Sequence, residues 1–194
     1  MPRVWPIPFN KTRAKEAIMV IMGLDLSTHT GLCVVGGKGE VLLLEEIDVG
    51  DSIGWDRVLH ITSRIMEVHS EFKPDHVVVE DLFVGHASSA IALAQVSLIV
   101  QFFFWQEGIA IHKIPATSLK KWLCGSGTAK KELMLMQVYK QFGVTAKNNN
   151  EADAIALARL GHCFFTGDDG YTKDQRAKAV ELFVPKVKET KKKK

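Results

Sequence analysis

The chain has 194 residues, of which 46% are hydrophobic, and it carries a formal net charge of +3 with a pI of about 8.7. This length fits one domain with a real core, and the mildly basic balance permits nucleic-acid binding without establishing it. The three cysteines, Cys33, Cys124 and Cys163, lack the spacing of a zinc site and indicate a reduced, cytosolic compartment. The first 16 residues lack the apolar stretch of a signal peptide.

We expect three parts: an N-terminal extension over 1–18, one folded domain over 19–165, and a polar, loosely ordered tail over 166–194. The tail ends in four lysines at 191–194. Such a run is usually a solvated chain end, and a tether to phosphate groups is the alternative.

Short apolar runs at the start of the folded domain predict strands, and glycine-marked links between them favour an antiparallel meander. The predicted elements, in chain order, are strands at 20–26, 31–35 and 41–47, a helix capped by Asp51 or Ser52 and ending near Glu71, a strand at 76–80, a helix at about 87–107, a strand at 109–114, and helices near 116–123, 129–141 and 151–164. This order predicts an α/β fold with a mixed five-stranded sheet, three antiparallel strands followed by parallel ones, flanked by helices.

The stretch 87–105 contains no formally charged residue. A stretch of this length can cross a membrane, but its five polar side chains argue against that. We therefore expect no membrane partner, and a buried helix that serves the core, a subunit interface, or both.

Three acidic residues stand at the ends of predicted core elements. Asp25 ends the first strand, Glu80 ends the strand at 76–80, and Asp153 lies in a final helix that is apolar almost all round. Such a helix is buried, and a buried carboxylate is costly unless a cation compensates it. Because carboxylate oxygens suit hard divalent ions, the three acids together favour a Mg²⁺ or Mn²⁺ site.

Each acid also has an ordinary structural interpretation. Asp25 fits a turn after its strand, Glu80 a surface position at a sheet edge, and Asp153 the first turn of a helix. A metal site is excluded only if all three structural interpretations hold at once. That combination is less probable than any one of them alone.

The order of these acids belongs to a wider pattern, which occupies residues 23–31, 80–83, 120–131 and 151–154. In order and spacing, these stretches resemble RuvC-type Holliday junction resolvases, which have the ribonuclease H-like fold. The resemblance implies an endonuclease that hydrolyses phosphodiesters in branched DNA, above all four-way junctions, and acts as a homodimer.

The resemblance also implies roles for individual residues. Asp25 would bridge two metal ions, and Glu80 and Asp153 would each complete the coordination of one ion. Lys131 would stabilise charge on the phosphate. The family often has another acid three residues before its last one, where this chain has Asn150, so Asn150 or the adjacent Glu151 is the candidate fourth ligand. The candidate DNA-binding residues are Phe83, Lys120, Lys121, Ser126, Thr128, Lys130 and Lys131.

Several alternatives stay open at this point. The same fold serves broader branch or flap endonucleases and RNA-processing nucleases. The segment 25–31 also resembles the first phosphate loop of actin-like and sugar-kinase ATPases, although the chain is about half their usual length. Loss of catalysis would leave a DNA-binding scaffold. We expect a cytoplasmic protein, in a host's cytoplasm if the compact chain is phage-encoded.

Overall fold

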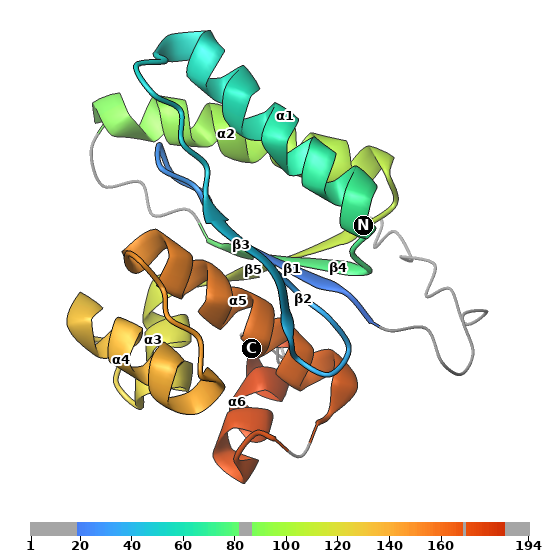
Figure 1. Ribbon diagram of the computed structural model, residues 1–194, viewed down its shortest axis with the longest axis vertical. Helices are drawn as coiled ribbons and strands as arrows, with labels where there is room; N and C mark the ends of the chain where they lie inside the picture. The colour runs from blue at the N-terminus through green and yellow to red at the C-terminus, as the bar shows by residue number, and fades with distance from the viewer. Residues whose placement is uncertain (1–18, 82–86, 169, 185–194) are drawn as a thin grey trace, which may run out of the picture.

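A five-stranded sheet forms the centre of the computed structural model, which describes residues 19–81, 87–168 and 170–184 (Figure 1). The strands are Ile21–Asp25 (β1), Gly31–Val35 (β2), Val41–Glu46 (β3), His76–Glu80 (β4) and Ala110–Ile114 (β5). Their spatial order is β3-β2-β1-β4-β5, with antiparallel β1/β2 and β2/β3 pairs and parallel β1/β4 and β4/β5 pairs. The predicted mixed sheet is confirmed.

Helices cover both faces of the sheet, which gives three layers. The helices are Gly54–Phe72 (α1), Ala87–Gln106 (α2), Ala116–Cys124 (α3), Lys131–Phe142 (α4), Asn149–Thr166 (α5) and Lys173–Phe183 (α6). Figure 1 shows α1 and α2 on one face and α3 to α6 on the other. Within the described ranges, no helix has the length and apolarity that a membrane crossing requires.

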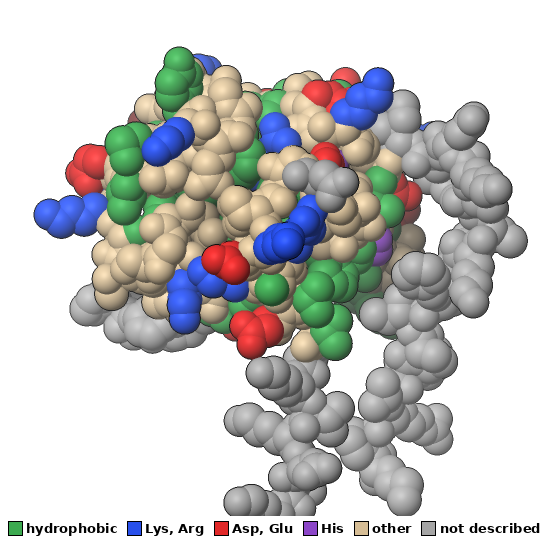
Figure 2. All heavy atoms as spheres, turned by 90° about the horizontal axis from the view of Figure 1, so that it is seen from below, with side chains coloured by type: hydrophobic (Ala, Val, Ile, Leu, Met, Phe, Trp, Pro, Cys, Tyr) green, Lys and Arg blue, Asp and Glu red, His purple; other side chains and the backbone are tan. Residues whose placement is uncertain are grey.

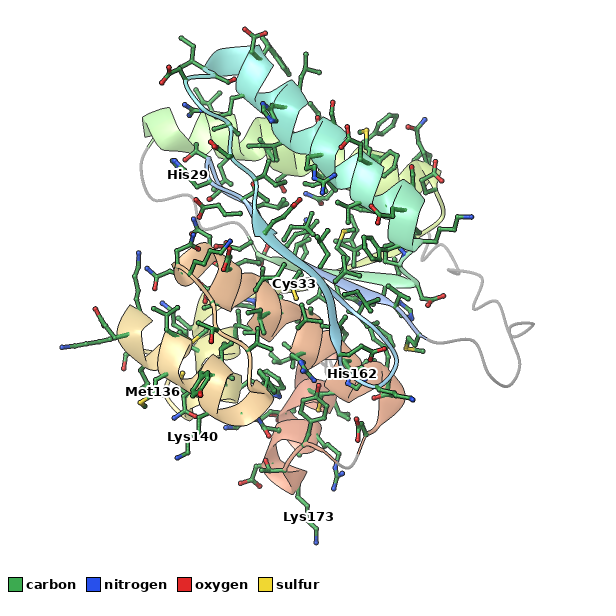
Figure 3. The ribbon with its side chains drawn as sticks, viewed as in Figure 1. His29, Cys33, Met136, Lys140, His162 and Lys173 are labelled. Atoms are coloured by element: carbon green, nitrogen blue, oxygen red, sulfur yellow. The ribbon has the colours of Figure 1, made fainter. Side chains whose placement is uncertain are left out.

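Alternation along the strands divides the core between these two faces. Met22 and Leu24 of β1 pack in the cluster under α1 and α2, whereas Ile21 packs in the cluster around α5. Cys33 of β2 joins the α5 cluster and lies between the sheet and that helix (Figure 3). Every second strand residue therefore points toward α5.

Helix α5 is buried along most of its length, as its all-round apolar sequence predicts. The Asn148 side chain caps it by accepting a hydrogen bond of 2.9 Å from the Glu151 N–H. The helix lies close to the sheet, since a Cβ atom added at Gly23 of β1 would strike the carbonyl oxygen of Ala154. The start of α5 is thus fixed against the ends of β1 and β2.

Two sequence predictions were wrong. Residues 173–183 form a helix rather than loosely ordered chain, because Ala179 is fully buried and the Trp122 indole donates a hydrogen bond of 3.1 Å to the Gln175 carbonyl. Helix α1 is capped by Ile53, which makes no side-chain cap hydrogen bond, and not by Asp51 or Ser52. The N-terminal extension and the four-lysine end lie outside the described residues.

Candidate active site

Two of the three predicted acids lie side by side at one end of the sheet. Parallel pairing of Leu24 with Val79 places the residues that follow them, Asp25 and Glu80, next to each other. Both side chains point to the α5 face, since Gly23 two residues earlier touches α5 and Val78 packs in its cluster. The sheet register alone therefore pairs these two carboxylates.

Helix α5 brings its polar residues to the same place. A Cβ atom at Gly31, which pairs with Asp25 across β1 and β2, would strike the carbonyl oxygen of Asn150. Asn150 and Asp153 are three residues apart and thus share one side of the helix. Asp153 joins the strand acids from the helix that covers them.

The electrostatics show that the three carboxylates act on one another. Burial, followed by the charges of Glu80 and Asp153, raises the pKa of Asp25 to about 8. Burial and the charge of Asp153 raise the pKa of Glu80 to about 7, and burial raises the pKa of Asp153 to about 6. Within the described part of the chain, none of the three accepts a hydrogen bond or ion pair that would compensate its charge.

Two of the predicted lysines flank this cluster. The half-buried Lys120 of α3 acts to lower the pKa of both Glu80 and Asp153. The exposed Lys131, the first residue of α4, does the same for Asp25 and Asp153. Positive charge thus reaches the carboxylates from the layer of α3 and α4 without forming a direct ion pair with them.

The other predicted DNA-contacting residues continue from these lysines toward solvent. Lys121, Ser126, Thr128 and Lys130 are all exposed, and the Ser126 and Thr128 hydroxyls lie 3.1 Å apart in the loop between α3 and α4. Figure 2, seen from below the layer of α3 to α6, shows lysine and arginine side chains at several points of this face. Phe83 lies outside the described residues.

The two candidates for a fourth ligand have different surroundings. The Asn150 amide donates a hydrogen bond of 2.7 Å to Oε2 of Glu46, at the end of β3. Glu151 is buried, and its Oε2 accepts a hydrogen bond of 2.7 Å from the Lys147 N–H. Glu151 therefore stabilises the turn before α5, whereas Asn150 faces the acid cluster.

Sequence reasoning missed Glu46. Its charge also acts to raise the pKa of Asp25. The signal was present in the alternation of β3, because Leu44 packs toward α5 and Glu46 lies two residues further along the same strand. The pairing of β3 with β2 is needed to show that Glu46 lies on the α5 face.

The oxygen atoms of Asp25, Glu80, Asp153 and Asn150 are of the type that hard divalent cations prefer. The three carboxylates are also partly buried, and none of them forms a direct ion pair with a lysine or arginine of the described residues. As the side chains stand, no three Asp, Glu, His or Cys groups of the described residues are close enough together to hold an ion. These residues therefore fit a divalent cation by the chemistry of their oxygen atoms and by their common place in the fold.

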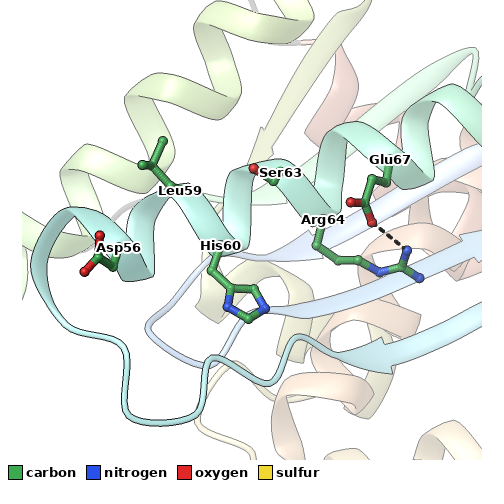
Figure 4. A pocket seen from close by; sticks show the side chains of 6 residues that line it. All are labelled: Asp56, Leu59, His60, Ser63, Arg64 and Glu67. Atoms are coloured by element: carbon green, nitrogen blue, oxygen red, sulfur yellow. Dashed lines mark hydrogen bonds and ion pairs between the residues drawn. The ribbon is translucent and has the colours of Figure 1, made fainter.

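A pocket elsewhere is lined by residues of α1 alone: Asp56, Leu59, His60, Ser63, Arg64 and Glu67 (Figure 4). It lies on the outer layer that covers the sheet face opposite α5 (Figure 1). None of the predicted site residues lines it, so it is separate from the acid cluster.

The chain is similar to known proteins over most of its length. The family model of crossover junction endodeoxyribonuclease RuvC matches residues 21–162. RuvC of Ruegeria pomeroyi is 30% identical over 155 residues, which cover 76% of this chain and 92% of that protein. RuvC of Thermus thermophilus is 29% identical over 167 residues, covering 76% and 95% of the two chains.

Solved structures give the same relationship. The Thermus thermophilus RuvC structure has a TM-score of 0.64 and 27% identity, and covers 75% of this chain and 95% of its own. The same protein in complex with a Holliday junction substrate has a TM-score of 0.63 and 26% identity, with coverages of 72% and 90%. The fold is ribonuclease H-like, and RuvC enzymes are metal-dependent nucleases. This chain belongs to the RuvC family of crossover junction endodeoxyribonucleases.

Proposed function

We propose that this chain resolves Holliday junctions by hydrolysing phosphodiesters at paired positions in a four-way DNA junction. The observation that carries the proposal is the cluster of Asp25, Glu80 and Asp153 at one end of the sheet, flanked by Lys120 and Lys131. Membership of the RuvC family and the likeness to a RuvC bound to a Holliday junction support it.

In the proposed reaction, Asp25, Glu80 and Asp153 would hold two divalent cations, Mg²⁺ or Mn²⁺. Bound there, such ions would supply an activated water and stabilisation of the leaving oxygen. Lys131 donates to a phosphate oxygen on which negative charge grows in the transition state. Lys120 helps to orient the phosphate, since its charge reaches Glu80 and Asp153.

The DNA backbone follows the exposed residues beyond these two lysines. Lys121 and Lys130 neutralise phosphates, and the hydroxyls of Ser126 and Thr128 donate to phosphate oxygens. Phe83 follows the strand that ends in Glu80, and we propose that it stacks on an unpaired base at the junction.

We further propose that two copies associate through the outer surface of α1 and α2. The α2 side chains Leu98, Phe102 and Trp105 are 65%, 58% and 74% exposed, and Leu59 of α1 is 57% exposed. Large exposed apolar groups on adjacent helices mark an interaction surface. A two-fold dimer through this surface supplies two active sites for two symmetric cuts. A cytoplasmic location stays a prediction of the sequence.

The test uses the purified chain with a labelled four-way junction, a flap and a plain duplex, in Mg²⁺, Mn²⁺ or EDTA. Paired symmetric nicks on the junction that disappear in EDTA and in Asp25→Asn support the proposal. Equal cutting of every branched substrate indicates a general branch nuclease instead. Absence of DNA cleavage and binding contradicts the proposal, and an ATP hydrolysis assay then tests the ATPase alternative.

A further inference from the structure

Glu46 occupies one row of the sheet with the central acid of the site. Gly31 of β2 pairs with Asp25 of β1 on one side and with Glu46 of β3 on the other. Cross-strand partners point to the same face of a sheet, so Asp25 and Glu46 both point toward α5. Gly31 between them has no side chain, which leaves the space above it to the start of α5.

Asn150 fills that space. Its carbonyl oxygen is the atom that a Cβ at Gly31 would strike, and its side-chain amide donates to Oε2 of Glu46 at 2.7 Å. An ionised carboxylate only accepts hydrogen bonds, so the nitrogen end of the amide must face Glu46. The amide oxygen is then turned away from Glu46, on the side of the helix that also carries Asp153.

We infer that Glu46 is the fourth acidic residue of the metal centre, supplied by β3 in place of a second acid on α5. Glu46 contributes the missing negative charge toward a divalent cation and orients the Asn150 amide, whose oxygen is the ligand. This inference rests on the proposed function. It also defines Glu46 as a positioning residue that acts on the metal through Asn150.

The neighbouring acid provides a matched control. Glu45 points to the opposite face of β3, where its two carboxylate oxygens accept hydrogen bonds of 2.8 and 3.1 Å from Arg64 of α1. Figure 4 shows the second partner of Arg64, Glu67, on the same helix. Glu45 and Glu46 are thus adjacent residues of the same type that lie on opposite faces of the sheet.

The experiment measures Mn²⁺ affinity of the DNA-free protein by the electron paramagnetic resonance signal of free Mn²⁺ at pH 8. The five proteins compared are the natural chain, Asp25→Asn, Glu46→Gln, Glu45→Gln, and the double variant Glu46→Gln with Asn150→Asp. We expect Glu46→Gln to weaken Mn²⁺ binding by about 10- to 100-fold, as loss of a partner of a metal ligand does. We expect Glu45→Gln to leave the Mn²⁺ affinity unchanged.

The double variant exchanges the two partners of the hydrogen bond. The new glutamine amide on β3 donates to the new carboxylate on α5, so the charge and the contact both persist. We therefore expect Mn²⁺ affinity to return close to that of the natural chain. If Glu46→Gln alone fails to fold, the double variant carries the test, and a weakened affinity in it contradicts the inference.

Unchanged Mn²⁺ affinity in Glu46→Gln, or an equal loss in Glu45→Gln, also overturns the inference. Asp25→Asn separates this failure from a failure of the proposed function. If Asp25→Asn loses Mn²⁺ binding while Glu46→Gln keeps it, only the role of Glu46 is wrong. If neither variant loses it, the metal centre itself is wrong.

Discussion

Both ends of α5 cover buried ionisable groups, but the residues around these groups differ between the two ends. At its start lie the carboxylates, whose pKa values are raised to about 8 for Asp25 and about 7 for Glu80. Near its last turn the ring of His76 stacks on Phe165 at 3.6 Å, and burial lowers the pKa of His112 to about 4. Both ends therefore favour the neutral form of their titratable groups.

The difference lies in what surrounds these groups. The histidines contact aromatic rings, and Phe183 of α6 covers His112 with ring centroids 5.0 Å apart. The carboxylates instead have one another and the charges of two nearby lysines. Burial with a raised or lowered pKa is thus not enough to identify a reactive site. The charges of Lys120 and Lys131 beside the carboxylates distinguish the acid end, since the histidines at the other end pack against aromatic rings.

The largest effect should come from removing the central acid. Asp25→Asn is expected to reduce junction cleavage by more than about 100-fold, because even partners of metal ligands cost 10–100-fold. A cleavage assay with the four-way junction measures this loss. The matched change at the other end, His112→Phe, should leave cleavage within about twofold, since His112 packs against Phe165 and Phe183 and not against the acids. A comparable loss of cleavage in Asp25→Asn and His112→Phe would contradict the assignment of the reaction to the acid end of α5.

The next effect concerns the flanking charge. Lys131→Met is expected to reduce the cleavage rate by roughly 100-fold, because one transition-state donor is worth that much. Lys140→Met is the control, since Lys140 lies in the last turn of the same helix, at the opposite end from Lys131 (Figure 3). Single-turnover rates at saturating Mg²⁺ separate this loss from weaker DNA binding. A rate unaffected by Lys131→Met would leave that lysine with a phosphate-binding role only.

A smaller effect tests how rigidly each end of α5 is held. Gly31→Ala is expected to destabilise the protein by about 1–3 kcal/mol, because the added methyl group meets the backbone of Asn150. Gly161→Ala, near the other end, meets side-chain methyl groups of Val78 and Ile21 at 2.7 and 2.8 Å rather than backbone atoms. Urea unfolding of both variants should show the larger loss for Gly31→Ala. The reverse order would mean that the acid end is the looser one.

The last effect is a pH dependence of stability with opposite signs at the two ends. Unfolded Asp25 ionises near pH 3.8 and folded Asp25 near 8, so without metal its contribution to stability falls as pH rises between those values. His112 ionises near 6.5 unfolded and near 4 folded, so its contribution falls as pH drops through that window. Urea unfolding in EDTA from pH 4 to 8 measures both.

Variants assign the two slopes. Asp25→Asn should flatten the decline in unfolding free energy toward pH 8, and His112→Phe should flatten the decline toward pH 4. If Asp25→Asn leaves the alkaline slope intact, another acid of the cluster carries the shared proton.

Much of this arrangement could be predicted from the sequence, because strand ends and an all-apolar helix are local patterns. The strand assignments and the acids Asp25, Glu80 and Asp153 came from such patterns. Glu46 did not, because Glu45 and Glu46 look equivalent until the register through Gly31 decides which one faces α5. Helix α6 was missed because few of its side chains are buried, so its sequence looks like solvated chain.

The close approach of α5 to Gly23 and Gly31 has a consequence for how such a site changes during evolution. Because backbone meets backbone there, the helix and the sheet form one frame whose spacing does not depend on the acids it carries. A carboxylate is then free to move between helix and strand, as an exchange between positions 46 and 150 would do, without rebuilding the frame. We expect relatives to keep the spacing between α5 and the sheet more closely than they keep the positions of their acidic residues.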